Sequence, residues 1–232
     1  MSSVFDCADP AELLTGMRLA RAAIARGELL VLPTDTVYGI AADAFQPRAV
    51  ERLLNAKGRG RQSPPPVLIP NTATLDAVTD DVPGVVRELI EAFWPGGLTV
   101  ILHARPSLAW DLGETQGTVA VRIPNHPVTL ELLHETGPLA VSSANRTGMP
   151  AALTAASARE MLGESVSVYL DAGTSGGGYE AVGERPGDLS STIVDATSLR
   201  TGGRLRVVRR GVLTNEQLAA VVGVDAFDEA PR

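Results

Sequence analysis

Apolar positions follow two different spacings along this chain. After Asp9 they recur every three or four residues until Gly27, which predicts a helix with one buried face. Asp9 is placed as its N-cap, and Glu12 is placed to complete a capping box. The continuous apolar run Leu29–Leu32 then predicts a short buried strand, ended by the proline that follows it.

The same two patterns continue to the C-terminus. Helical spacing predicts further helices over Pro47–Ala56, Val85–Trp94, Val128–His134, Ala155–Leu162 and Asn215–Val222, the last after a Thr214–Gln217 capping box. Short apolar or alternating runs predict strands at Val67–Ile69, Leu98–Leu102, Thr118–Ile123, Leu139–Val141, Val166–Leu170, Ser191–Val194 and Leu205–Val208.

Strands and helices therefore interleave, which is typical of the α/β class with a twisted sheet flanked by helices. Several strands follow one another without a helix between them, so we expect a mixed sheet rather than a parallel one. One domain is predicted over residues 1–232, with its core at about 10–222 and a frayed acidic tail at 223–232. The glycine-rich segment Gly173–Gly187 is a candidate lid.

Composition excludes several classes of protein. Hydrophobic residues at 44% and charged residues at 20% exclude wholesale disorder. Aromatic residues at 4% and a net charge of −7 disfavour a protein built on base-stacking platforms. One cysteine gives no internal disulfide, and three scattered histidines predict no metal site. We find no membrane span and no signal peptide, so the expected compartment is the cytoplasm.

Two segments carry the densest candidate chemistry. Pro33–Gly39 follows a buried strand and holds two threonines, an aspartate and a tyrosine, at the place where open α/β sheets bind ligands. It is equally readable as a turn whose threonines satisfy their own backbone. In the second segment, Lys57, Arg59 and Arg61 alternate with glycines. Lys57 is the only lysine beside nineteen arginines, which suggests a site that needs a compact point charge; the alternative is a solvated loop charge.

Other polar groups also gather at predicted strand junctions. Arg122 ends an alternating strand, Ser142–Asn145 and Ser190–Asp195 adjoin two others, and Arg209 closes the last. Each feature alone is ordinary, because such residues also make surface ion pairs and turns. Together they predict a single anion-binding site built by several segments.

Taken in order, these segments resemble the threonylcarbamoyl-AMP synthase family (YrdC-like domains). The matching motifs span roughly residues 10–222 and are Pro33–Gly39, Lys57-x-Arg59, Trp94-Pro95-Gly96 with Leu98-Thr99, Thr118–Arg122, Ser143-Ala144-Asn145 and Ser191-Thr192-Ile193, with an arginine-glycine close near Arg209. The resemblance implies a concave, cationic cavity in the sheet. It also implies a reaction in which L-threonine, bicarbonate and ATP give threonylcarbamoyl-AMP and pyrophosphate, for the modification of adenosine in tRNA.

The resemblance also assigns residues. It implies that Lys57 and Arg59 are catalytic. The implied ATP-binding residues are Lys57, Arg59, Arg61, Thr118, Ser143 and Arg209, and the implied threonine-binding residues are Thr34, Arg122, Val141 and Ser191. Mg²⁺ is expected to enter with ATP, because no carboxylate cage for a resident metal is visible. The partner is either the tRNA itself or a downstream transferase, and no membrane is involved.

The chain departs from the family's pattern at Pro64-Pro65-Pro66, where a proline-leucine strand that often ends in histidine is usual. An amino-acid contact from this stretch is therefore not assigned. Two alternatives stay open: an enzyme that makes a carbamoyl-adenylate for another acceptor, and an RNA-binding module without catalysis.

Overall fold

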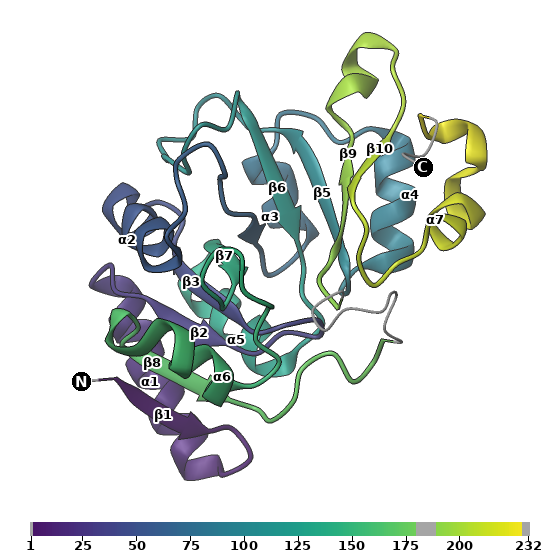
Figure 1. The fold of residues 1–232 in the computed structure, drawn as a ribbon. Coiled ribbons are helices and arrows are strands. Elements are labelled where there is room, and N and C mark those ends of the chain that lie inside the picture. The colour runs from purple at the N-terminus through teal and green to yellow at the C-terminus, as the bar shows by residue number, and fades with distance from the viewer. Residues whose placement is uncertain (1, 180–188, 229–232) are drawn as a thin grey trace.

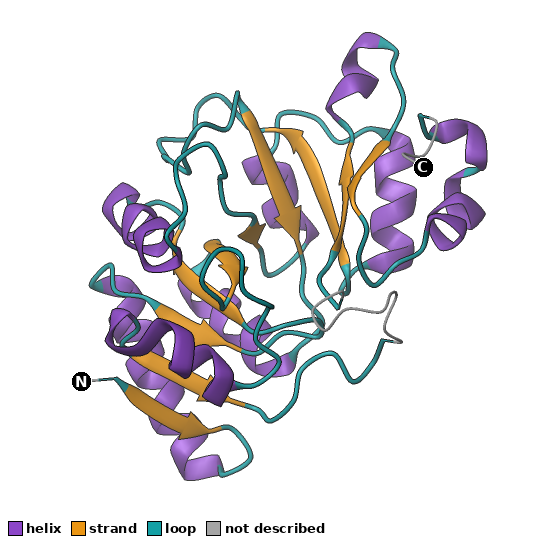
Figure 2. Ribbon diagram, viewed as in Figure 1, coloured by secondary structure: helices purple, strands orange, loops and turns teal. Residues whose placement is uncertain are grey.

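The fold is one twisted ten-stranded sheet with helices on its outer faces (Figures 1 and 2). The computed structural model describes residues 2–179 and 189–228. The strands are β1 (Ser3–Asp6), β2 (Leu30–Leu32), β3 (Gly39–Asp43), β4 (Val67–Leu68), β5 (Leu98–His103), β6 (Thr118–Arg122), β7 (Leu139–Ser143), β8 (Val168–Asp171), β9 (Thr192–Asp195) and β10 (Arg206–Arg209).

The helices connect these strands and cover them. They are α1 (Pro10–Ala25), α2 (Pro47–Lys57), α3 (Thr72–Val78), α4 (Gly84–Phe93), α5 (Pro127–Thr136), α6 (Ala155–Leu162) and α7 (Asn215–Val222), with short 3₁₀ turns η1 (Gly163–Ser165), η2 (Thr197–Thr201) and η3 (Val224–Ala226). Within the described residues, no helix is both long and apolar enough to cross a membrane.

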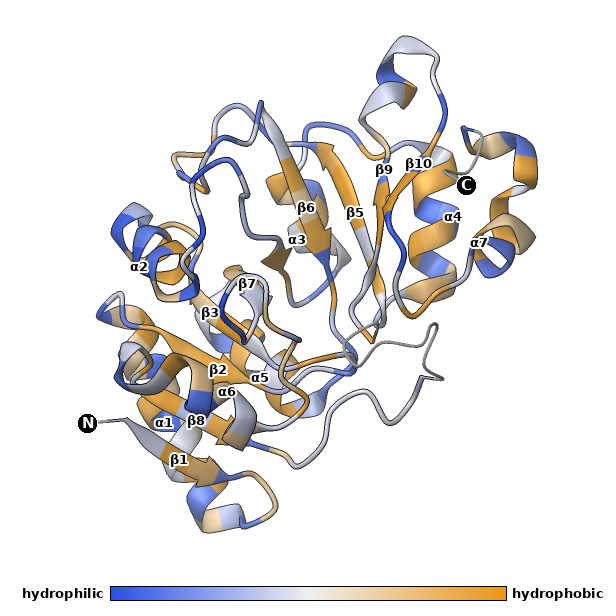
Figure 3. Ribbon diagram, in the orientation of Figure 1, coloured by the Kyte–Doolittle hydropathy of each residue, from blue (hydrophilic) through white to orange (hydrophobic). Residues whose placement is uncertain are grey.

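The sheet is mixed, as the sequence predicts. Its order is β1-β8-β2-β3-β7-β4-β6-β5-β9-β10. The pairs β1–β8, β2–β8, β4–β6 and β5–β9 are parallel, and the other neighbours are antiparallel. Figure 3 shows the strands as mainly hydrophobic and the connecting loops as more hydrophilic.

Helices cover the two halves of the sheet differently. Around β2, β3, β7 and β8, helices α1 and α5 pack on one face while α2 and α6 pack on the other. Around β5, β6 and β9, helices α3, α4 and α7 belong to a single apolar core on one face. The opposite face of β5, β6 and β9 is not covered by these helices, so its side chains are available to line a cavity.

Strand alternation separates core from cavity in the second half. Successive side chains of a strand point to opposite faces of the sheet. In β5, Leu98, Val100 and Leu102 belong to the apolar core, whereas Thr99 and Ile101 line a cavity. A one-residue slip of register would exchange these two faces, so the same pairing that forms the core also places the site.

Most predicted elements are confirmed, with ends that differ by one or two residues. The sequence patterns missed β1, β3 and α3. Strand β3 is small and rich in alanine, but it is fully paired between β2 and β7. Strand β1 is short and exposed and gains its pairing from β8, far along the chain.

Two local expectations are confirmed and one is corrected. Asp9 caps α1 as predicted, but the Glu12 carboxylate accepts from the Asp6 N–H instead of closing a capping box on Asp9. The Thr214–Gln217 capping box forms.

The frayed tail is wrong for residues 225–228. These residues contain part of η3, and the Asp228 N–H donates to the Leu205 carbonyl. Residues 229–232 of the expected tail, and most of the candidate lid, 180–187, lie outside the described residues.

Thr192 allows a test of how strand β9 is held to the segment that follows β10. Its fully buried hydroxyl donates to the Leu213 carbonyl (2.8 Å) and accepts from the Leu213 N–H (2.9 Å). Thr192→Val keeps the shape but leaves both backbone groups unpaired, so we expect the free energy of unfolding to fall by about 2 kcal/mol. Urea denaturation measures this loss. Thr192→Ser, which keeps the hydroxyl, is the control, and equal stability of the valine variant and the wild type would contradict the expectation.

Candidate functional site

A cavity of about 360 Å³ opens on the face of β5, β6 and β9 that carries no helix. Both halves of the sheet line it. The first half contributes Thr34 and residues 36–39 from the turn after β2, and the end of β7. The second half contributes the alternate residues of β5, β6 and β9, together with Arg209 at the end of β10.

Eight of the ten residues expected at the site line this cavity: Thr34, Arg59, Thr118, Arg122, Val141, Ser143, Ser191 and Arg209. Lys57 and Arg61 do not belong to its lining. The sequence motifs therefore predict correctly which segments of the chain meet at the cavity. They are less accurate in predicting which cationic side chains face it.

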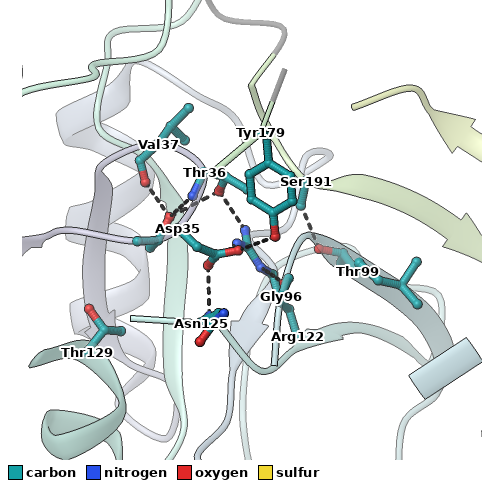
Figure 4. A network of polar contacts seen from close by, with 12 residues as sticks. Asp35, Thr36, Val37, Gly96, Thr99, Arg122, Asn125, Thr129, Tyr179 and Ser191 are labelled. Carbon is teal, nitrogen blue, oxygen red and sulfur yellow. Dashed lines mark hydrogen bonds and ion pairs between the residues drawn. The ribbon is translucent and has the colours of Figure 1, made fainter. Parts of the chain in front are cut away.

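The guanidinium of Arg122 lies at the centre of a polar network (Figure 4). Its Nε donates to the Gly96 carbonyl (2.8 Å), Nη1 to the Thr36 hydroxyl (2.9 Å) and Nη2 to the Asp35 carboxylate (2.6 Å). The side chains of Arg122 and Asp35 are only 7% and 9% exposed. These three acceptors fix the plane of the guanidinium and leave two of its five N–H groups for a ligand.

The direction of the hydrogen bonds through the turn after β2 follows from the donors present. The Thr34 hydroxyl donates to the Val37 carbonyl (2.6 Å), so the Thr36 hydroxyl is the donor in the 3.0 Å contact between the two threonines. The Thr36 oxygen in turn accepts from Arg122. The Thr34 oxygen also accepts from the Thr36 N–H (3.2 Å), so its one donor and two acceptors are all used within the turn. Thr34 thus satisfies its own turn, as one of the two interpretations held, and also lines the cavity.

Ser191 makes hydrogen bonds to two other residues that line the cavity, Thr99 and Arg209. Its hydroxyl lies 2.8 Å from the Thr99 hydroxyl and accepts from Nη2 of Arg209 at 2.8 Å. Nε and Nη2 of Arg209 also donate to the Ser191 carbonyl. Ser191, which is expected to contact an amino acid, is therefore hydrogen-bonded to Arg209, which is expected to contact phosphate.

The cavity concentrates positive charge. Arg209 is an exposed residue as a whole, but its guanidinium is turned inward and loses water there. This desolvation, followed by the charges of Arg122 and Arg59, lowers the pKa of Arg209 to about 10. Among the described residues that line the cavity there is no carboxylate. Such a site suits an anion.

Lys57, at the end of α2, does not present its ammonium to the cavity. Its Nζ donates to the Ser143 carbonyl, to the Asn145 carbonyl (2.7 Å) and to the Asn145 side-chain oxygen (3.2 Å). The Thr147 N–H returns to the Lys57 carbonyl (2.9 Å). An ammonium has three donors, so these contacts use all of them. Direct contact of Lys57 with phosphate stays a prediction that this geometry does not support.

Arg61 also faces away from the site. Its guanidinium makes an exposed ion pair with Asp111 (2.7 Å). The segment around it is nevertheless fixed, because the Arg61 carbonyl accepts from the Glu114 N–H (2.8 Å). Arg59 is the member of this loop that lines the cavity, and its Nη1 lies 3.3 Å from the Ser142 hydroxyl.

Three prolines form part of the cavity wall. Pro64, Pro65 and Pro66 line it beside Ser63, and the Pro66 carbonyl accepts from the Val141 N–H (2.8 Å). Proline has no N–H and no polar side chain. These three prolines therefore supply shape and apolar surface to the cavity and no polar side chain.

Several groups at the site escaped the sequence patterns as individual contacts. Asp35 and Thr36 lie inside a motif that was singled out, but their bond to Arg122 bridges 86 residues or more. Tyr179, whose hydroxyl donates to Asp35 (2.9 Å), belongs to the glycine-rich segment. The sequence analysis did not single out Tyr179, and the one signal that could have found it is an aromatic residue within a glycine-rich segment.

Comparisons with known proteins find relatives along nearly the whole chain. The family model Sua5_yciO_yrdC, described as telomere recombination, matches residues 22–211. A protein of Mycobacterium tuberculosis (strain ATCC 25618 / H37Rv) named putative threonylcarbamoyl-AMP synthase is 49% identical over 226 residues, which are 97% of this chain and 98% of the relative. The threonylcarbamoyl-AMP synthase of Bacillus subtilis (strain 168) is 35% identical over 88% of this chain and 56% of its own length.

A solved structure is similar over the whole described fold. The crystal structure of Pyrococcus abyssi Sua5 complexed with L-threonine superposes with a TM-score of 0.83 at 28% identity, covering 98% of this chain and 62% of that one. This chain thus spans little more than half the length of the Bacillus and Pyrococcus relatives, and nearly all of the mycobacterial one.

The pKa of the Lys57 ammonium can be measured directly. Burial, and then the charge of Arg59, lowers the pKa of Lys57 to about 7, while the three oxygens around Nζ act against that lowering. Because Lys57 is the only lysine, ¹⁵N-lysine labelling gives one Nζ signal, which we expect to titrate well below 10.5.

The same shift has a consequence for stability. Between about pH 7 and 10.5 the unfolded lysine still holds its proton and the folded one releases it, so this group's contribution to stability rises with pH across that window. Urea denaturation across the window should show that rise in the wild type and lack it in Lys57→Met. A midpoint at or above 10.5 would show that the ammonium is fully compensated where it lies.

Proposed function

The chain belongs to the Sua5/YciO/YrdC family, and from this premise we propose that it is a threonylcarbamoyl-AMP synthase, which uses L-threonine, bicarbonate and ATP. The observation that carries the proposal is the convergence of Arg59, Arg122 and Arg209 on one cavity without a lining carboxylate among the described residues. Two anionic groups, the carboxylate of an amino acid and a triphosphate, match this charge.

The amino-acid end of the site is assigned to Arg122. Its two remaining N–H groups suit a carboxylate, which accepts paired hydrogen bonds from a guanidinium. Thr34 and Ser191 line the same cavity. The Ser191 hydroxyl, which contacts Thr99 and Arg209, keeps one hydrogen-bonding position for the amine or hydroxyl of threonine, and Thr34 is assigned to shaping the pocket. Val141 contributes wall surface.

The nucleotide end is assigned to Arg59 and Arg209, with Thr118 and Ser143. In the proposed reaction the threonine amine attacks bicarbonate and water leaves, which gives a carbamate. A carbamate oxygen then attacks the α-phosphorus of ATP, and pyrophosphate leaves with the bonding electron pair. Such a displacement depends on positioning and charge neutralisation, which arginines and hydroxyls provide.

The structure changes the role that we assign to Lys57. We assign it as a positioning residue, because its three donors hold the backbone and side chain of the loop that presents Ser143. Arg59 keeps the assignment as a catalytic residue, and Arg61 is assigned to fixing the loop around it.

Mg²⁺ belongs to the proposal as an ion carried by the nucleotide. No group of three or more His, Cys, Asp or Glu residues in the described parts of the chain is placed to hold a metal. The donors that line the cavity are arginines and hydroxyls, which fit a metal bound to the phosphates and not a resident one. Mg²⁺ would there neutralise charge on the triphosphate.

The product indicates where the enzyme works. Threonylcarbamoyl-AMP is a reactive mixed anhydride that a second enzyme must consume to modify tRNA. We therefore place the protein in the cytoplasm, next to a tRNA-modifying transferase. Direct contact with tRNA is the alternative partner assignment.

Pyrophosphate release from ATP tests the function. We expect release only when both L-threonine and bicarbonate are present, because the carbamate is the nucleophile. Omitting each in turn is the control. Release that ignores both omissions would sink the synthase proposal, release with bicarbonate but no amino acid would favour another acceptor, and RNA binding without turnover would favour the non-catalytic module.

Arg209 and Arg206 form a matched pair for testing the nucleotide end. Arg209→Met removes a cavity cation, and we expect kcat/KM for ATP to fall by at least about tenfold, as for the loss of one charge-assisted contact. Arg206 makes an exposed ion pair with Asp195 (3.0 Å), so Arg206→Met should change kcat/KM for ATP less than twofold by the usual weakness of such pairs. Equal losses in the two variants would contradict the assignment of Arg209.

A further inference from the structure

Tyr179 contacts the network that holds Arg122, although nothing in the proposed chemistry uses it. Its hydroxyl donates to one Asp35 oxygen, Oδ2, at 2.9 Å. The other oxygen, Oδ1, accepts from Arg122 (2.6 Å) and from the Asn125 N–H (2.9 Å). Figure 4 shows the phenol oxygen and the guanidinium both beside the Asp35 carboxylate.

The segment that carries Tyr179 packs against the other partners of Arg122 as well. A Cβ added to Gly96 or Gly97 would lie 3.4 or 3.2 Å from the phenol oxygen, so the ring rests on the turn whose Gly96 carbonyl accepts from Arg122. A Cβ on Gly176, which has φ +86°, would lie 2.9 Å from the Thr36 carbonyl. Residues 176–179 thus lie beside Gly96 and Thr36 and contact Asp35 directly.

Asp35 has two ways to bind Arg122. A carboxylate and a guanidinium prefer two parallel hydrogen bonds when nothing prevents them. In this structure Asp35 gives Arg122 only Oδ1, and Oδ2 accepts from the phenol. Burial, and then the charge of Asp35, raises the pKa of Tyr179 to about 12, so the phenol keeps the proton that it donates.

We propose that Tyr179 is a positioning residue for the amino-acid end of the site: its hydroxyl holds the second oxygen of Asp35, so that Arg122 keeps two N–H groups for the carboxylate of the substrate. The proposal rests on the proposed function, since it concerns the binding of threonine. Without the hydroxyl, Asp35 is free to turn and take a second N–H of Arg122, in competition with the substrate.

Tyr179→Phe tests this with the ring kept in place. We expect the Kd for L-threonine, measured by isothermal titration calorimetry, to rise about tenfold, the usual effect of one hydrogen bond. KM for threonine should rise by a similar factor, while KM for ATP and kcat at saturating threonine should change less than twofold. Tyr169→Phe is the matched control, because its hydroxyl donates to the Gly163 carbonyl (2.8 Å) and its residue does not line the cavity.

An analogue without the carboxylate separates positioning from general structure. L-threoninamide offers Arg122 no carboxylate, so its inhibition constant against threonine should be the same, within twofold, for wild type and Tyr179→Phe. A loss of the same size for threonine, threoninamide and ATP would mean that the variant damages the site generally, and it would overturn the proposal.

The remaining outcomes are also decisive. Wild-type affinity for threonine in Tyr179→Phe would overturn the role of the hydroxyl while leaving the proposed function intact. Failure of the wild type to bind threonine or to need it for pyrophosphate release would overturn the proposed function, and the role of Tyr179 with it.

Discussion

The buried ion pair between Asp35 and Arg122 is the interaction on which the site depends. Its two charges lie 2.6 Å apart on side chains that are 9% and 7% exposed. Taking two charges out of water is costly, and their attraction offsets that cost only when the remaining donors and acceptors are also paired. Here Thr36, Gly96, Asn125 and Tyr179 supply those partners. Removing one charge alone would leave the other buried, at a cost of about 3–5 kcal/mol.

These partners come from four separate stretches of the chain. The turn after β2, the turn before β5, the loop after β6 and the glycine-rich segment meet at this pair. The sheet makes the meeting possible, because its pairing fixes where each of the first three stretches leaves a strand. The ion pair and the sheet register thus support each other, and substrate geometry is inherited from both.

How far the sequence predicts this molecule depends on the range of the interactions involved. Helices and strands with their own apolar pattern were predicted almost to the residue, such as α6 and α7. Strand β3 could not be, because Gly-Ile-Ala-Ala-Asp has little strand preference and becomes a strand through β2 and β7. Composition singled out Lys57, yet the direction of its ammonium depends on carbonyls 86 and 88 residues away. Tyr179 meets Asp35 across 144 residues, beyond any local pattern.

The gathering of arginines in the cavity has a consequence for the protein without its ligands. After desolvation, the charges of Arg122 and Arg59 lower the pKa of Arg209, so these three arginines repel one another across the cavity. The fold therefore stores unfavourable electrostatic energy that an anionic ligand releases, so ligand binding and thermal stability are linked. The lifetime of the folded chain would then depend on the concentration of that anion. The simplest stabilising changes would remove these charges, so a gain in stability would come with weaker binding of the anion.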